Sequence, residues 1–350
     1  MGNTFTFGSS TKREAVLLQP AIAGDLDKVK ELVGTFLATY CSTSNEGYVN
    51  PASDPKLHDF VNKLDPQGNN AMHGAVFAGH LEIVKYLVEC CGASLTLPNN
   101  LGCFPLWLAA GYNRTQVLEY LLIKLDDQAL LQTNSSGDTP LVAAASRGNL
   151  DACKILLDQA KKTKMVEKLM ALNNQNGDTP LKVAIANSEG GTSAEELVDL
   201  LLTHTSDILL NTPNKIGLTP LLVACERDDD KLLAKLLDHN ADITICDATG
   251  ASPLAVAAFC GSKDVLAVLL LEKDFAQLLL EQPNQNGCTP LWLAARSGRP
   301  QVVDMFLKAG ADPTIKNKDG LSPIDAAIKY KRVEVSALFN ASSNEQQQQS

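Results

Sequence analysis

Gly-Asp-Thr-Pro-Leu occupies residues 137–141 and recurs unchanged at residues 177–181. Related segments, with Gly first, Ser or Thr third, Pro fourth and Leu or Ile fifth, begin at Gly217, Gly250, Gly287 and Gly320. Degraded copies begin at Gly68 and Gly102, and successive copies lie 33 to 40 residues apart. A short segment that returns at this spacing predicts a tandem array of one structural unit.

Each copy predicts the start of a helix. Ser or Thr supplies an N-cap, and Pro suits the first helical turn because its missing N–H has no partner there. A short helix rich in alanine follows, as in Ala143-Ala144-Ala145, and then a second helix with paired leucines, as in Leu156-Leu157. Turn dipeptides such as Asn176-Gly177 precede the copies. The repeating unit is therefore predicted to contain two helices and a hairpin turn.

This pattern resembles the ankyrin-repeat family over roughly residues 14–340. The resemblance implies an all-α fold, an ankyrin-repeat solenoid of stacked helix-turn-helix units joined by β-hairpin loops. We expect this organisation: a flexible tail at 1–13, an N-terminal capping helix pair at 14–38, a polar insertion loop at 39–64, eight repeats at 65–340, and a disordered Gln-rich tail at 341–350.

Two features depart from the family pattern. The His that commonly follows the Pro-Leu pair survives only as His73, and tryptophans stand there in two repeats, Trp107 and Trp292. We favour partial burial of these indoles over direct contact with a partner. Two units run to 40 residues, and the Met-Val-Glu-Lys-Leu-Met segment at 165–170 predicts a lengthened second helix.

The resemblance implies that partner proteins bind the concave face of the first helices and the hairpin tips. The exposed positions at the end of the first helices supply the candidate binding residues: Phe77, Tyr112, Arg147, Arg227, Phe259, Arg296 and Tyr330. Aromatic and arginine side chains are the commonest binding hot spots. Two questions stay open. The rings either contact a partner or pack on neighbouring repeats. The arginines either mark an acidic partner segment or balance an otherwise acidic protein.

The resemblance favours a scaffold or adaptor that binds one or more proteins, and the alternative is a regulatory or inhibitory subunit of one enzyme. No phosphate-binding loop, metal-ligand spacing or nucleophile–base pair occurs in the sequence. We therefore expect no catalytic activity, no cofactor and no metal.

Charge and cysteine content limit the partners and the compartment. The formal net charge is −10, with 40 acidic and 30 basic residues, which disfavours nucleic acid and anionic lipid as general partners. Nine cysteines without metal-binding spacing indicate reduced thiols in a cytoplasmic protein. No apolar stretch is long enough to span a bilayer, so we expect no integral membrane segment.

The first residues, Met1-Gly2-Asn3-Thr4-Phe5-Thr6, match the N-myristoylation pattern, with Gly2 as the acylation site. A single myristoyl chain binds membranes weakly, so stable association needs a second signal. The sequence thus leaves two interpretations open, a membrane-associated protein tethered through Gly2 and a disordered lead-in at residues 1–13.

Overall fold

The computed structural model describes four stretches of the chain: 15–40, 54–187, 192–271 and 279–339. They belong to two compact units, which divide between His204 and Thr205. Helices connected by turns build both units, and no strand occurs in the four described stretches. The predicted tails, including Gly2, lie outside the described residues.

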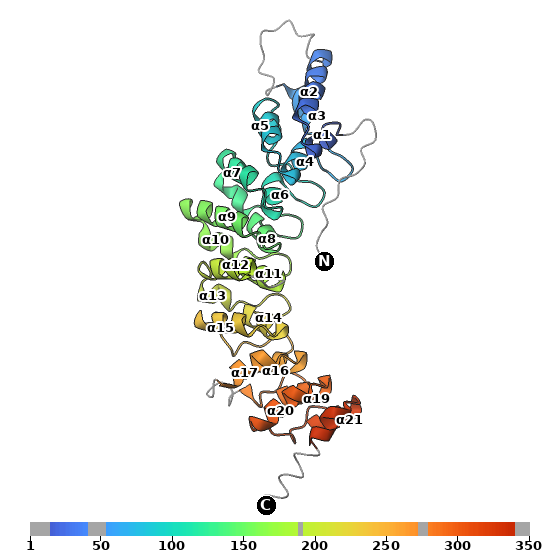
Figure 1. Cartoon of the computed structure of the whole chain (residues 1–350), viewed down its shortest axis with the longest axis vertical. Helices are drawn as coiled ribbons and strands as arrows, with labels where there is room; N and C mark the ends of the chain where they lie inside the picture. The colour runs from blue at the N-terminus through green and yellow to red at the C-terminus, as the bar shows by residue number, and fades with distance from the viewer. Residues whose placement is uncertain (1–14, 41–53, 188–191, 272–278, 340–350) are drawn as a thin grey trace, which may run out of the picture. The chain divides into compact units, whose positions relative to one another are not determined.

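Unit 1 contains two layers of helices. The first helices of its repeats pack one on the next: α1 (Leu18–Ala23), α4 (Ala71–Ala78), α6 (Pro105–Gly111), α8 (Pro140–Ala145) and α11 (Pro180–Asn187). The second helices form the other layer: α2 (Leu26–Tyr40), α5 (Leu81–Glu89), α7 (Thr115–Lys124), α9 (Leu150–Lys162) and α12 (Thr192–Leu202). Each first helix also packs on the second helix of its own repeat (Figure 1). The predicted stacked helix pairs are confirmed in this unit.

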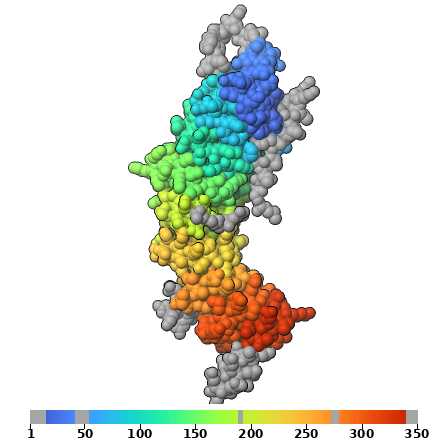
Figure 2. Space-filling model, viewed as in Figure 1, coloured from blue at the N-terminus to red at the C-terminus, as the bar shows by residue number. Residues whose placement is uncertain are grey.

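Unit 2 repeats the arrangement. Its first helices pack in the order α14 (Pro220–Arg227), α16 (Pro253–Cys260), α19 (Pro290–Ser297) and α21 (Pro323–Lys329). The second helices are α15 (Asp230–Asp238), α17 (Lys263–Leu271), α20 (Pro300–Lys308) and a helix at residues 333–339. In the space-filling view, the repeats of this unit (yellow to red) form a continuous surface (Figure 2).

The recurring segment starts the first helices as predicted. In α19, the Thr289 hydroxyl oxygen accepts the Trp292 N–H at 3.3 Å, and Pro290 occupies the first turn. Small residues then allow neighbouring first helices to approach closely. A Cβ atom at Gly74 in α4 would lie 2.9 Å from side-chain carbons of both Leu18 and Ile22 in α1. The small residues that recur at this place therefore allow consecutive repeats to pack closely.

The hairpin turns are held by an Asn side chain. The Asn134 side-chain oxygen accepts the backbone N–H groups of Ser136 and Asp138, both at 2.9 Å, while Gly137 takes a φ of 79°. Such a left-handed φ suits Gly because it has no Cβ. The Ser135 N–H donates to the Leu101 carbonyl of the preceding turn at 3.0 Å. The loops thus pair between repeats as hairpin turns, without a regular strand in the described residues.

The structure differs from the predicted loop at 39–64. Helix α2 continues to Tyr40, and helix α3 (Pro55–Val61) occupies the other end, while residues 41–53 lie outside the described stretches. Asp54 caps α3 by accepting the Lys56 N–H at 2.8 Å. The ring of Phe60 stacks on Phe36 of α2 at 4.2 Å between centroids. A cap and apolar packing therefore stabilise a helix inside a stretch that is polar in composition.

Extra helices fill the longer repeats. The prediction of one lengthened second helix across 165–170 is wrong, because α9 ends at Lys162 and a separate α10 (Val166–Ala171) follows. Lys164 lies between them with a φ of 58°, a left-handed conformation that stops the helix. Two short helices occupy other connections: η2 (Asp127–Leu131) in unit 1 and α13 (Asp207–Leu210) in unit 2.

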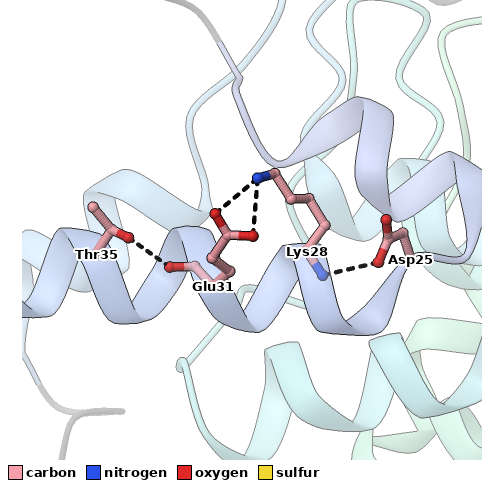
Figure 3. A network of polar contacts seen from close by, with 4 residues as sticks. All are labelled: Asp25, Lys28, Glu31 and Thr35. Carbon is pink, nitrogen blue, oxygen red and sulfur yellow. Dashed lines mark hydrogen bonds and ion pairs between the residues drawn. The ribbon is translucent and has the colours of Figure 1, made fainter.

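The solvent face of α2 is polar. Lys28 Nζ lies 2.8 Å from a carboxylate oxygen of Glu31, and the Lys28 N–H donates to Asp25 at 2.9 Å (Figure 3). The Thr35 hydroxyl donates to the Glu31 carbonyl at 2.8 Å. These contacts lie on exposed side chains, so this face of α2 is solvated.

Candidate protein-binding surfaces

Three candidate residues of unit 1 come together with a tryptophan. The rings of Phe77 and Tyr112 meet edge to face, with centroids 4.5 Å apart. The Arg147 guanidinium lies 4.8 Å from the Tyr112 centroid and 5.1 Å from that of Trp107. These distances are those of favourable aromatic and cation–π contacts. We call these four residues, which come from three consecutive repeats, the unit 1 cluster.

The residues of the unit 1 cluster range from buried to exposed. Trp107 is buried, Phe77 and Tyr112 are half-buried, and Arg147 is exposed. The Arg147 side chain makes one long hydrogen bond, from Nη1 to the Ala143 carbonyl at 3.4 Å. The rings therefore pack on neighbouring repeats, and the same packing holds an exposed guanidinium in place.

A groove of about 700 Å³ opens beside this cluster. Trp107, Tyr112 and Arg147 line it together with polar side chains from two successive hairpin turns, among them Asp138 and Asp178. Burial raises the pKa of the Asp138 carboxyl above its usual value. The groove therefore offers hydrogen-bond donors, acceptors and aromatic surface within one concavity.

The buried indole N–H of Trp107 has no hydrogen-bond acceptor among the residues that the structure describes. The equivalent Trp292 Nε1 donates to the Leu321 carbonyl at 3.0 Å, and His73 Nε2 lies 3.2 Å from the Cys103 carbonyl oxygen. A buried unpaired donor costs about 1–3 kcal/mol. Trp107 thus differs from Trp292 and His73, whose ring nitrogens contact a carbonyl oxygen of the next repeat. Its unpaired N–H belongs to a side chain that lines the groove.

Unit 2 holds a second cluster, in which an arginine again lies over a tryptophan and a tyrosine. The Arg296 guanidinium lies 5.9 Å from the Trp292 centroid and 5.2 Å from that of Tyr330. Trp292 is buried, whereas Arg296 and Tyr330 are exposed. We call these three residues the unit 2 cluster.

The other two candidates of unit 2 lie outside that cluster. Arg227 is exposed at the end of α14. Phe259 of α16 is 49 % exposed, and no ring or cation stacks on it among the described residues. The structure therefore groups five of the seven candidate residues into two clusters and leaves these two apart.

Comparison with known families decides the fold family. The family described as ankyrin repeats (3 copies) matches residues 17–130, 126–212 and 191–277, and the family described as ankyrin repeat matches residues 286–318. These matches cover well over half of the chain. The chain belongs to the ankyrin-repeat family. Ankyrin repeats generally mediate protein–protein interaction, and ankyrin domains are typically binding modules without catalytic activity.

Three relatives illustrate how this ankyrin chain compares with longer proteins. It is 34 % identical over 131 residues to "Tyrosine-protein kinase HTK16" of Hydra vulgaris, covering 37 % of this chain and 17 % of the relative. It is 29 % identical over 306 residues to "Transient receptor potential cation channel subfamily A member 1" of Homo sapiens, covering 78 % of this chain and 27 % of the relative. It is 26 % identical over 335 residues to "Ankyrin repeat protein nuc-2" of Neurospora crassa, covering 95 % of this chain and 28 % of the relative. The chain thus spans less than a third of each relative.

A set of hydrogen bonds connects consecutive ankyrin repeats and was not predicted from the sequence. In each case a side chain before the second helix reaches a main-chain carbonyl near the end of the preceding repeat's first helix. The pairs are His80 Nε2 with Ile22 at 3.1 Å, Arg114 Nε with Phe77 at 2.7 Å, Asn149 Nδ2 with Gly111 at 2.8 Å, and Arg332 Nε with Arg296 at 2.9 Å. These bonds satisfy carbonyls that a helix end leaves unpaired. A polar residue recurs at this position, but its type changes from repeat to repeat.

The described ankyrin repeats contain no cluster of three or more His, Cys, Asp or Glu placed to hold a metal ion. None of the helices in the four stretches is both long and apolar enough to cross a membrane. The cysteines within them carry free thiols, and burial raises the pKa of the Cys153 thiol to about 12. Such a buried thiol is a poor nucleophile at neutral pH.

Proposed function

We propose that this ankyrin-repeat protein is a non-catalytic scaffold or adaptor that binds partner proteins through the concave face of its first helices and its hairpin turns. The unit 1 cluster carries the proposal, because three of its residues, Trp107, Tyr112 and Arg147, line a groove of about 700 Å³ with aromatic rings and an exposed guanidinium. Concave sites with such side chains are typical of protein hot spots.

The groove suits an extended segment of a partner chain. A peptide backbone presents carbonyl acceptors and N–H donors in alternation, and the groove offers both kinds of partner. Arg147 covers the Trp107 ring from an exposed position, so a rotation of its side chain would open the indole to a partner carbonyl. That carbonyl would accept the Trp107 N–H, which none of the described residues accepts.

Affinity capture with matched variants tests the proposal. The full chain, Y112A/R147A and I123A would be immobilised in turn, and proteins bound from the native cell lysate would be quantified by mass spectrometry. Ile123 is the control because it is 80 % exposed on α7, in the layer of second helices. We expect Y112A/R147A to lose partners that I123A retains, with unchanged helical content in both.

Equal recovery by all three proteins would contradict binding through the groove. The number of partners separates scaffolding from the alternative role. Many unrelated partners support a scaffold, whereas a single stoichiometric enzyme would instead identify a regulatory or inhibitory subunit.

A further inference from the structure

The end of unit 2 has a charge opposite to that of the whole protein. Residues 284–339 contain eight basic and five acidic residues, a net charge of +3, whereas the full chain carries −10. Five of these basic side chains are exposed near the helix–helix turns of the last two repeats: Arg296, Arg299, Lys329, Lys331 and Arg332. We call this group the basic surface.

Repeat stacking brings the basic surface together. Arg296 lies in the last turn of α19, and Lys329 ends α21, which packs directly on α19 (Figure 1). Arg299 precedes α20, and Arg332 precedes the helix at 333–339. The Arg332 Nε donates to the Arg296 carbonyl at 2.9 Å and so joins the two turns.

These cations lack counter-charges within the described part of the chain. In unit 2, Lys308 pairs with Asp304 at 2.7 Å, but no described carboxylate pairs with a member of the basic surface. Neighbouring like charges repel one another, so the uncompensated group is electrostatically unfavourable on its own. An anionic partner would relieve that repulsion.

Arg296 is held in a conformation suited to an anion. Trp292 and Tyr330 flank its guanidinium at 5.9 Å and 5.2 Å, and its side chain donates no hydrogen bond to any described residue. A guanidinium that rests against rings keeps the N–H groups at its rim free for a bidentate acceptor. Because the Arg296 side chain is already held between the two rings, it loses less conformational entropy on binding.

We propose that the basic surface binds a partner segment rich in Asp and Glu, with one carboxylate docked on the Arg296 guanidinium. This inference rests on the proposed protein-binding function and names the chemistry of one partner segment. Charge complementarity selects an acidic segment, and the planar fork of Arg296 matches a carboxylate. A nucleic acid is disfavoured because its long phosphate backbone would extend over a protein of net charge −10.

Fluorescence anisotropy with the full chain tests the proposal. The probe is a fluorescein-labelled peptide of alternating Glu and Gly, and the neutral reference is the same peptide with Gln in place of Glu. We expect R296A/K329A to bind the Glu peptide about tenfold more weakly than wild type, because charged hydrogen bonds are lost. Added salt should weaken wild-type binding, and the Gln peptide should bind little.

Matched variants separate the site from net charge. K215A/K231A also removes two positive charges from exposed positions in unit 2, but away from the basic surface, and should retain wild-type affinity. R296K should bind more weakly than wild type, because it keeps the charge but loses the planar fork. Partner capture by the unit 1 groove is measured separately, in lysate with Y112A/R147A, so a negative result with the Glu peptide leaves the proposed protein-binding function standing.

Equal affinities of R296A/K329A and K215A/K231A would overturn the proposal. So would tighter binding of a labelled single-stranded DNA oligonucleotide than of the Glu peptide, which would assign the basic surface to nucleic acid.

Discussion

Arg114 donates a 2.7 Å hydrogen bond from Nε to the main-chain carbonyl of Phe77, which belongs to the preceding repeat. The same arginine side chain covers Gly79, the left-handed residue that ends α4. One side chain therefore closes the end of a helix and connects two repeats. Because Phe77 belongs to the unit 1 cluster, this bond also helps to place a candidate binding residue.

Arg114→Ala should destabilise the protein. Loss of this charged donor leaves the Phe77 carbonyl without its partner, and we expect the free energy of unfolding to fall by about 1–3 kcal/mol. Urea denaturation followed by circular dichroism measures the change. Lys154→Ala, an exposed substitution on α9, is the control and should change stability by less than about 0.5 kcal/mol. Equal stability of the two variants would remove the role given to Arg114.

The turn glycines should differ in their tolerance of a side chain. Gly217 and Gly320 hold the same place in their repeats, with φ of 83° and 75°. A Cβ atom at Gly217 would collide with the backbone of Ala248 in the next turn, whereas nothing lies within 4 Å of a Cβ at Gly320. Gly217→Ala should therefore cost about 1–3 kcal/mol more than Gly320→Ala. Similar losses in urea denaturation would show that the turns are not in close contact.

The two tryptophans should differ in how much stability is lost when the indole N–H is removed. Trp292→Phe removes the donor to the Leu321 carbonyl and should cost about 1 kcal/mol more than Trp107→Phe, whose donor is unpaired. Both changes remove similar ring volume, so their difference reports the hydrogen bond. Chemical denaturation of both variants gives the comparison. A larger loss for Trp107→Phe would contradict the unpaired state of that N–H.

His73 should make stability fall with acidity. Burial lowers its pKa from 6.5 to about 4, against opposing contributions from the Cys103 carbonyl and Asp65. Between these two values the unfolded chain binds a proton that the folded chain does not, so acid favours unfolding. We expect the contribution of neutral His73 to the free energy of unfolding to be complete above pH 6.5 and to disappear as the pH falls towards 4. Nuclear magnetic resonance titration of His73 checks this directly, and a midpoint near 6.5 would contradict it.

The recurring Gly-x-Thr-Pro-Leu segment was enough to predict the helix starts and the hairpin turns, because caps and left-handed glycines are local features. It also indicated that Phe77, Tyr112 and Arg147 lie on the first-helix face. Their contact with Trp107 was not predictable, since it depends on how far one repeat rotates against the next. The break at Lys164 escaped prediction because a single left-handed residue has no strong sequence signal.

The inter-repeat hydrogen bonds were hidden for a different reason. His80, Arg114, Asn149 and Arg332 share a position and a role but not a residue type. A search for identical motifs therefore passes over them. Helix α3 was hidden by composition, because its apolar side is only three residues, Leu57, Phe60 and Val61, among polar neighbours.

Site-specific photo-cross-linking tests the central claim, that the first-helix face is the surface that partners contact. A photoreactive phenylalanine would replace Tyr112 in the groove of unit 1, or Ile123 in the layer of second helices. We expect cross-links to partner proteins in native lysate from position 112 and few from position 123. Cross-links from position 123 with none from position 112 would contradict it.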